Sequence, residues 1–214
     1  MKRILLGLLL LGGILQTAHA GLALDITGGG VPNFCAGGNC TIGWSFSVSS
    51  PITVDALGLW DQDSNGLGEV HDVGLWTNAG ILLTSTTVTN ASTPVASAYS
   101  GGRWLFQDIT DVVLGAGTYR IGALYSNLSP DLNRALVGSG SVTTIPEVAL
   151  GDAYVVFNPN LAFPTDNASA ANAGVFGPNF LTTNAPPLPE PSSIALLALG
   201  ALGMSLVRRQ RTPL

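Results

Sequence analysis

Basic residues are scarce in the middle of this 214-residue chain, and lysine is missing there altogether. Five of the eight lysines and arginines lie near the two ends, so residues 21–188 hold three arginines against twelve acidic residues, a net charge of −9. A protein that binds nucleic acid needs a basic surface to neutralise phosphates. The charge balance therefore argues against a nucleic-acid partner and leaves cations, neutral sugars and other secreted polymers.

Residue types that carry catalysis are equally scarce. Residues 21–188 contain one histidine, His71, so a Ser/His/Asp or Cys/His mechanism would have to be built on this side chain alone. We expect His71 to be an ordinary loop or strand residue. A pair of carboxylates could serve a glycosidase, but Glu69 and Asp72 lie in one short stretch, whereas that chemistry needs acids that flank a cleft. We predict that the protein is not an enzyme.

Sustained helical periodicity is missing between the two ends, and short stretches with strand periodicity are present instead. Apolar and small polar residues alternate over 41–48, the period of a half-buried strand. Short strands separated by turn residues are typical of a β-sandwich. We predict an all-β, single-domain fold, a β-sandwich or jelly roll, over residues 21–184. The further strands expected are 54–60, 70–76, 81–88, 103–109, 119–125, 136–143, 153–157 and 174–180.

The N-terminus has the three parts of a secretory signal peptide. Two basic residues precede an apolar run over 4–15, and the small-x-small triplet at 18–20 follows it. A membrane-spanning helix is the alternative, but it needs roughly 20 apolar residues. We predict a signal peptide over residues 1–20, removed by signal peptidase to leave Gly21 at the N-terminus.

The C-terminus also has three parts in series. A proline-rich linker over 185–191 precedes an apolar stretch over 192–207 and a basic tail over 208–214. Prolines keep the linker extended, the apolar stretch can form a short transmembrane anchor, and the basic tail stays cytoplasmic. The span is short, so a temporary anchor is an equally consistent interpretation. The basic residues of the tail are Arg208, Arg209 and Arg211.

The triplet Pro189, Glu190 and Pro191, followed by two serines, the apolar run and the arginines, resembles the PEP-CTERM sorting signal of Gram-negative bacteria. In that family a membrane-embedded, transpeptidase-like cysteine protease, the exosortase, recognises the signal and cuts near the triplet. The resemblance implies an exported protein that is held in the inner membrane by its C-terminus, and then delivered to the cell surface or extracellular matrix. It says nothing about the activity of the delivered body.

The two cysteines, Cys35 and Cys40, are close together in the sequence. Export to an oxidising compartment favours a disulfide between them. A zinc site would need a second pair, and the spacing is not that of a C-x-x-C redox motif. A bridge that closes so short a loop stabilises the fold modestly, by less than roughly 3 kcal/mol.

An acidic stretch that begins at Asp61 matches the D-x-[DN]-x-[DN]-G pattern of a calcium loop, and hard oxygen ligands suit Ca²⁺. The closing acid is aspartate rather than glutamate, Gly68 replaces an apolar residue, and the flanks are strands rather than helices. The alternative is that Asn65 and Gly66 form a hairpin turn between the strands at Trp60 and Val73. The candidate calcium ligands are Asp61, Asp63, Asn65, Leu67 through its carbonyl, Glu69 and Asp72.

A second resemblance covers roughly residues 51–125. The segments ALGLWDQDSNGLGEVHDVGLWTNAGILLTSTTV, GGRWLFQDIT and LGAGTYRIGALY are similar to DUF4082-like β-sandwich modules of bacterial surface proteins. That family has no established catalytic role, so the resemblance implies a fold and a surface location rather than an activity.

Two functions fit an exported, acidic β-sandwich. The first is a structural or adhesive surface component, and the second is a calcium-stabilised carbohydrate-binding module associated with exopolysaccharide. Sugar binding usually uses an exposed aromatic platform, whereas rings in the core indicate a scaffold. The rings available for such a platform are Trp60, Trp76, Tyr99, Trp104 and Tyr125.

Overall fold

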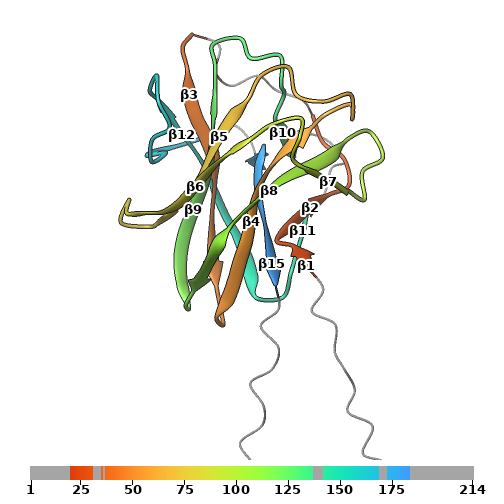
Figure 1. The fold of residues 1–214 in the computed structure, drawn as a ribbon. Helices are drawn as coiled ribbons and strands as arrows, with labels where there is room; N and C mark the ends of the chain where they lie inside the picture. Colours follow the sequence, from red (N-terminus) through yellow and green to blue (C-terminus); the bar gives the residue numbers. More distant parts are fainter. Residues whose placement is uncertain (1–19, 31–34, 36, 137–141, 169–172, 184–214) are drawn as a thin grey trace, which may run out of the picture. The chain divides into compact units, whose positions relative to one another are not determined.

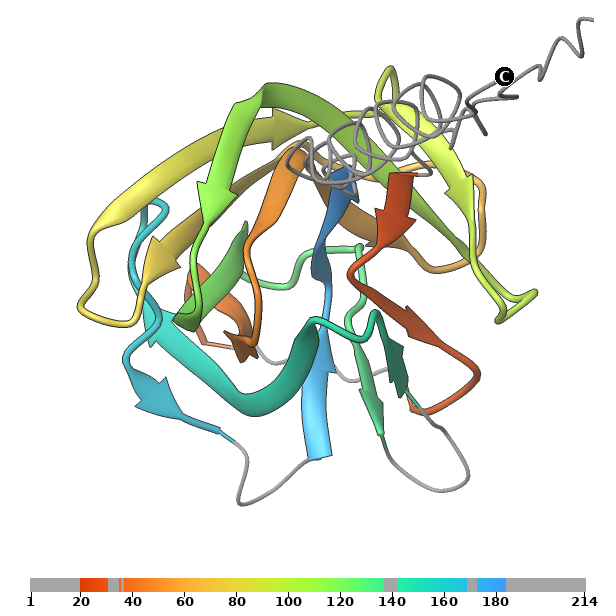
Figure 2. The ribbon, with the colours of Figure 1, turned by 90° about the horizontal axis from the view of Figure 1, so that it is seen from below.

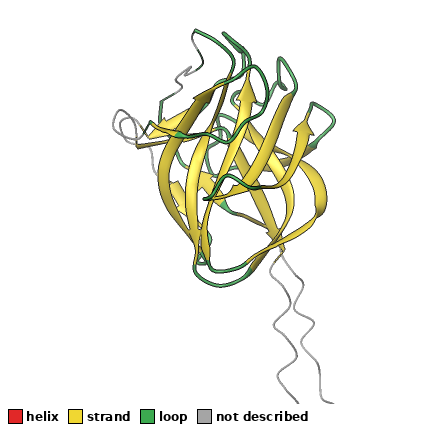
Figure 3. Ribbon diagram, turned by 90° about the vertical axis from the view of Figure 1, so that its left-hand side faces the viewer, coloured by secondary structure: helices red, strands yellow, loops and turns green. Residues whose placement is uncertain are grey.

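A computed structural model describes residues 20–30, 35, 37–136, 142–168 and 173–183. These residues form strands, turns and loops without a helix (Figure 3), which confirms the all-β prediction. They belong to one compact unit, Ala20–Ala185. None of them lies in a helix long and apolar enough to cross a membrane. The predicted signal peptide, except Ala20, and the predicted linker, anchor and tail lie outside the described residues.

Most of the strands lie in two antiparallel sheets (Figure 1). The larger sheet has the order β13 (Asp166–Asn167), β12 (Val148–Phe157), β3 (Cys40–Val48), β9 (Gly117–Tyr125), β5 (His71–Thr77) and β6 (Leu82–Val88). The second has the order β1 (Ala20–Leu22), β15 (Pro178–Thr183), β4 (Ile52–Asp61), β8 (Arg103–Leu114) and β7 (Thr93–Ala96). Two further pairs join β10 (Arg134–Leu136) to β14 (Ala173–Phe176), and β2 (Leu24–Ile26) to β11 (Val142–Thr144).

Each strand expected from the sequence overlaps an observed one. The stretch expected over 136–143 contributes to two separate strands, β10 and β11, and the strands β1, β2, β7 and β13 were not predicted. Four of the strand pairs enclose one another along the chain. The pair β5–β6 lies between β4 and β8, which lie between β3 and β9, which lie between β1 and β15.

The two main sheets face each other across a shared aromatic core. The ring of Phe180, on β15, lies 6.1 Å from that of Trp44 and 4.9 Å from that of Phe46, both on β3 of the other sheet. Trp44 Nε1 also donates a hydrogen bond to the carbonyl of Pro178 at 2.9 Å. This arrangement is consistent with the predicted β-sandwich.

A row of three glycines crosses the larger sheet. Gly43 of β3 is paired with Gly122 of β9, which is paired in turn with Gly74 of β5. The indole of Trp76 lies against Gly74 and Gly122, where a Cβ atom would meet it. Phe163 also packs against this indole, with ring centroids 6.2 Å apart. The missing side chains therefore make room for a buried tryptophan on the outer face of the sheet.

The strand β3 is buried on both faces, whereas its alternating pattern predicts one exposed face. Only Ser47 is exposed among its nine residues. Segments from the C-terminal third of the body cover the small polar face: Ala162 donates a backbone hydrogen bond to Thr41 Oγ1 at 3.0 Å, and Asp152 donates one to Ser45 Oγ at 2.9 Å. The prediction of a half-buried strand was wrong. The alternating pattern of β3 carries no information about the covering segments, because they are far away in the sequence.

The two ends of the body lie together at one end of the second sheet. Ala20 is paired with Thr183, and Figure 2 shows β4, β15 and β1 side by side. Thr183 is also paired with Thr53 near the start of β4, whereas Asp61 is the last residue of that strand. At about 3.3 Å per residue, Asp61 lies about 26 Å from the end where the chain enters and leaves.

We expect Gly43→Ala to destabilise the fold by about 2 kcal/mol, because the added Cβ meets backbone atoms that cannot rotate away. It would lie 2.7 Å from Gly122 Cα and against the carbonyl of Ile121. Gly115→Ala is the matched control, since no atom lies within 4 Å of its added Cβ. Urea unfolding of the two variants measures the difference, and equal midpoints would contradict the tight contact between β3 and β9.

Candidate functional site

The acidic loop crosses from one sheet to the other. It follows β4 in the second sheet and precedes β5 in the larger sheet. The hairpin alternative is therefore wrong: both edges of β4 are already paired, with β8 and with β15, so β5 has no edge to join. Ser64 and Gly66 have positive φ angles of 60° and 104°, which reverse the chain within the loop.

Asp61 fixes the start of the loop. Asp61 is 2% exposed. Its carboxylate accepts a hydrogen bond from Arg103 Nε at 2.8 Å and one from the Gly66 amide at 3.1 Å. Arg103 is the residue paired with Asp61 on the neighbouring strand β8. A buried carboxylate needs such partners, so Asp61 is held by a cation that the fold itself supplies.

Side-chain amides hold the remainder of the loop. Asp63 accepts hydrogen bonds from the backbone and the side-chain amide of Asn65, at 3.3 and 2.6 Å. Asn90 accepts from the Leu67 amide at 2.6 Å and donates to the Leu67 carbonyl at 2.9 Å. The carbonyl predicted as a calcium ligand is thus engaged by an asparagine from the turn after β6.

The loop borders a polar pocket of about 340 Å³. Four of the six predicted calcium ligands contribute to its lining, namely Asp61, Asp63, Asn65 and Leu67. Glu69 is directed toward His71 and Asp131 instead. Asp72 is exposed on β5 and accepts a hydrogen bond from Thr87 Oγ1 at 2.6 Å. Calcium binding by the loop stays a prediction.

Asp131 joins this pocket from a second loop, which follows β9. Its carboxylate accepts hydrogen bonds from the Gly68 and Glu69 amides at 2.9 and 3.1 Å, and from His71 Nε2 at 2.8 Å. Sequence reasoning missed Asp131. It could have been found only from the pairing of β5 with β9, which places the loop before β5 beside the loop after β9.

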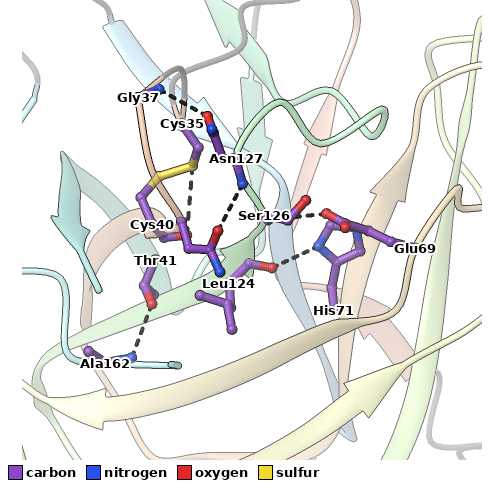
Figure 4. Close-up of a disulfide and its surroundings, with 11 residues drawn as sticks. Cys35, Gly37, Cys40, Thr41, Glu69, His71, Leu124, Ser126, Asn127 and Ala162 are labelled. Atoms are coloured by element: carbon purple, nitrogen blue, oxygen red, sulfur yellow. Dashed lines mark hydrogen bonds and ion pairs between the residues drawn. A yellow bond between two sulfur atoms is a disulfide. The ribbon is translucent and has the colours of Figure 1, made fainter. Parts of the chain in front are cut away.

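His71 is fully buried at the start of β5. Its Nδ1 lies 2.8 Å from the carbonyl of Leu124 (Figure 4), and its Nε2 lies 2.8 Å from Asp131 Oδ2. Each nitrogen of the ring therefore lies within hydrogen-bond distance of an oxygen atom. Glu69 Oε1 lies 4.0 Å from the same Nε2. We expected His71 to be an ordinary loop or strand residue. It instead lies at the centre of a charged cluster that consists of Glu69, His71 and Asp131.

Hydrogen bonds keep both acids of this cluster ionised. Burial by itself would raise the pKa of the Asp131 carboxyl, but the hydrogen bonds from His71, Gly68 and Glu69 outweigh it and hold this pKa below its ordinary value. Burial also opposes ionisation of Glu69, but hydrogen bonds from Ser126 and Ser129 lower its pKa. The cluster therefore places two ionised carboxylates beside the imidazole of His71.

Tyr125 packs on His71, with ring centroids 4.6 Å apart. Burial raises the pKa of its hydroxyl well above the ordinary value, and the charges of Asp131 and Glu69 raise it further. This hydroxyl and Asn133 Oδ1 both lie against Gly177, and within the described part of the chain neither has a hydrogen-bond partner.

The predicted disulfide is present between Cys35 and Cys40 (Figure 4), whose Cα atoms are 5.5 Å apart. Two hydrogen bonds join its loop to the loop that carries Asp131. The Gly37 amide donates to Asn127 Oδ1 at 3.1 Å, and the Asn127 amide donates to Asn39 Oδ1 at 3.0 Å. The disulfide thus fixes a loop that supports the charged cluster.

The predicted aromatic platform is mostly in the core. Four of its five rings are at most 4% exposed, and the fifth, Tyr99, is half-buried against Trp60. The four buried rings are Trp60, Trp76, Trp104 and Tyr125. These four cannot offer a face on which a sugar could stack.

One family, described as the PEP-CTERM protein-sorting motif, matches residues 187–211. This match agrees with the resemblance of the C-terminus, and it supports export through the exosortase system, processing at the membrane and a cell-surface or extracellular destination. No curated protein and no solved structure matches the chain. The resemblance of the body to DUF4082-like modules stays a prediction.

We expect Asp131→Asn to lower the free energy of unfolding at pH 7 by about 3 kcal/mol, because the variant removes the carboxylate that accepts hydrogen bonds from the buried His71 ring and from two backbone amides. The folded pKa of Asp131 lies below the unfolded value, so the stabilisation is present above about pH 4 and is lost as the pH falls through the folded pKa. Urea unfolding between pH 2 and pH 7 measures both effects.

Asp63→Asn is the control for this variant, because Asp63 is an exposed acid of the same pocket. It should change the free energy by less than about 0.5 kcal/mol. If Asp131→Asn lost stability on acidification as steeply as the wild-type protein, the ion pair with His71 would not be a source of stability.

Proposed function

We propose that the protein is a structural or adhesive component of the cell surface or extracellular matrix, delivered by the exosortase system. The observation that carries the proposal is the sorting motif at residues 187–211. In this proposal a signal peptide directs export, residues 192–207 hold the protein in the inner membrane, and cleavage near Pro189-Glu190-Pro191 releases the body.

The delivered body, in this proposal, is a jelly-roll β-sandwich. The nested pairs β5–β6, β4–β8, β3–β9 and β1–β15 support it, because a jelly roll is a long antiparallel ribbon folded into two sheets. The linker has to start beside Thr183, at the end of the second sheet opposite Asp61. The polar pocket therefore lies at the opposite end of the second sheet from Thr183.

Burial of the tryptophans supports a structural or adhesive role over sugar binding by stacking. A calcium-stabilised carbohydrate-binding module is the second candidate. The observation in its favour is that four predicted calcium ligands line one pocket, where carboxylate and amide oxygens could bind the ion and the ion could bind sugar hydroxyls.

The sorting proposal is tested by Pro189→Ala and Glu190→Ala in a host that has an exosortase. We expect the wild-type protein to accumulate on the surface or in the medium with a C-terminus near residue 190, as mass spectrometry would detect. The variants should remain in the inner-membrane fraction with their arginines intact. Deletion of the exosortase gene is the matched control and should reproduce the phenotype of the variants. A wild-type protein exported with an intact C-terminus would contradict the proposal.

The calcium candidate predicts saturable binding when CaCl₂ is titrated into the exported protein in a calorimeter. Because Asp63 lines the pocket and Asp72 is paired with Thr87 outside it, Asp63→Ala should weaken binding at least about tenfold and Asp72→Ala should leave it unchanged. Absence of binding at millimolar calcium would leave the loop as a structural connection only.

A further inference from the structure

We propose that Glu69, His71 and Asp131 form a binding site for a divalent transition-metal ion, and that Zn²⁺ is the ion it suits best. One ligand atom from each side chain lies within 4.8 Å of the other two. The set combines an imidazole nitrogen with two carboxylate oxygens. Zinc accepts this combination, whereas calcium prefers oxygen ligands alone.

The distances between the ligand atoms bracket those of a tetrahedral zinc site. Zinc bonds of about 2.0–2.2 Å place neighbouring ligand atoms about 3.4 Å apart. His71 Nε2 lies 2.8 Å from Asp131 Oδ2 and 4.0 Å from Glu69 Oε1. To reach this spacing, each of these two distances would change by about 0.6 Å, and the two carboxylate oxygens, which lie within 4.8 Å of each other, would approach by up to about 1.4 Å. The ion would replace the proton between Nε2 and Oδ2, which leaves to solvent.

Each ligand is already oriented by a partner that metal binding would keep. His71 Nδ1 donates to the Leu124 carbonyl, which directs Nε2 to the ion, as in many metal sites with a histidine. Glu69 Oε1 accepts from the Ser126 amide at 3.1 Å (Figure 4), and backbone amides hold Asp131. The ordering of the ligands therefore does not depend on the ion.

An ion can reach this site from solvent. His71 is fully buried, but the side chains of Asp131 and Glu69 are 10% and 28% exposed. Asp131 also lines the polar pocket, so an ion could enter there and water could complete its coordination. The two carboxylates give the site an excess of negative charge when His71 is neutral. Glu69 is the one residue that this site has in common with the six predicted calcium ligands.

The alternative is that the His71–Asp131 contact only joins two loops. The two possibilities differ in the response to zinc, which is tested on the exported protein after treatment with EDTA. We expect calorimetric titration with ZnCl₂ to show one saturable site per chain. Glu69→Gln should weaken binding at least about tenfold, because it removes a charged ligand and keeps the acceptor for Ser126. Asp63→Asn, in the same pocket but outside the site, should leave the affinity unchanged.

A second measurement identifies the ligand atom. His71 is the only histidine in residues 21–188, so ¹⁵N-histidine labelling gives one imidazole in the exported body. Zn²⁺ should shift the Nε2 resonance, and Ca²⁺ should not. The proposal is overturned by absence of saturable binding at millimolar zinc, by equal affinity of Glu69→Gln and the wild-type protein, or by a zinc-bound state in which Nε2 is unchanged.

Discussion

Both edges of β4 are occupied, by β8 on one side and by β15 on the other, and this constraint determines where the chain can go next. The segment after Asp61 cannot turn back as a hairpin, so it crosses to the other sheet and starts β5 at His71. There β5 is paired with β9, which places the loop of Asp131 beside it. The polar pocket and the charged cluster both result from this crossing.

Three basic side chains of the described residues contact other groups of the body. Arg103 is paired with Asp61, His71 contacts Asp131, and the guanidinium of Arg120 lies 3.6 Å from the ring centre of Tyr154. Because buried carboxylates need partners, Arg103 and His71 allow acids to lie at the end of the sandwich where the loops cross. Six of the other ten acids of residues 21–188 are exposed, and a net charge far from zero keeps an exported protein soluble.

Local patterns in the sequence predicted what depends on local structure. Alternation predicted strands such as β3, and the spacing of Cys35 and Cys40 predicted their disulfide, because both depend on neighbouring residues and on the compartment. The acidic stretch from Asp61 was likewise identified as a candidate site. Four of its proposed ligands line one pocket, although its shape is a crossing between sheets rather than a hairpin.

The features that the sequence did not predict depend on strand order. Asp131 contributes to the site only because β9 is beside β5, and β3 loses its exposed face only because Ala162 and its neighbours cover it. The glycine row is another case, since Gly43, Gly74 and Gly122 are paired only after three strands have come together. In the sequence, a single glycine only weakens the prediction of a strand. The position of Trp76 is explained once the three glycines lie side by side in the sheet.

The position of the aromatic side chains limits how the body can recognise another molecule. Facing sheets are about 10 Å apart, and large rings such as Trp44 and Phe180 fill that space. Rings used in this way are not available for stacking on a ligand. Carboxylate and amide oxygens line the pocket instead, in a body whose net charge is strongly negative. Recognition at this end would therefore depend on hydrogen bonds and on cations, which makes metal content the property that separates a passive scaffold from a binding module.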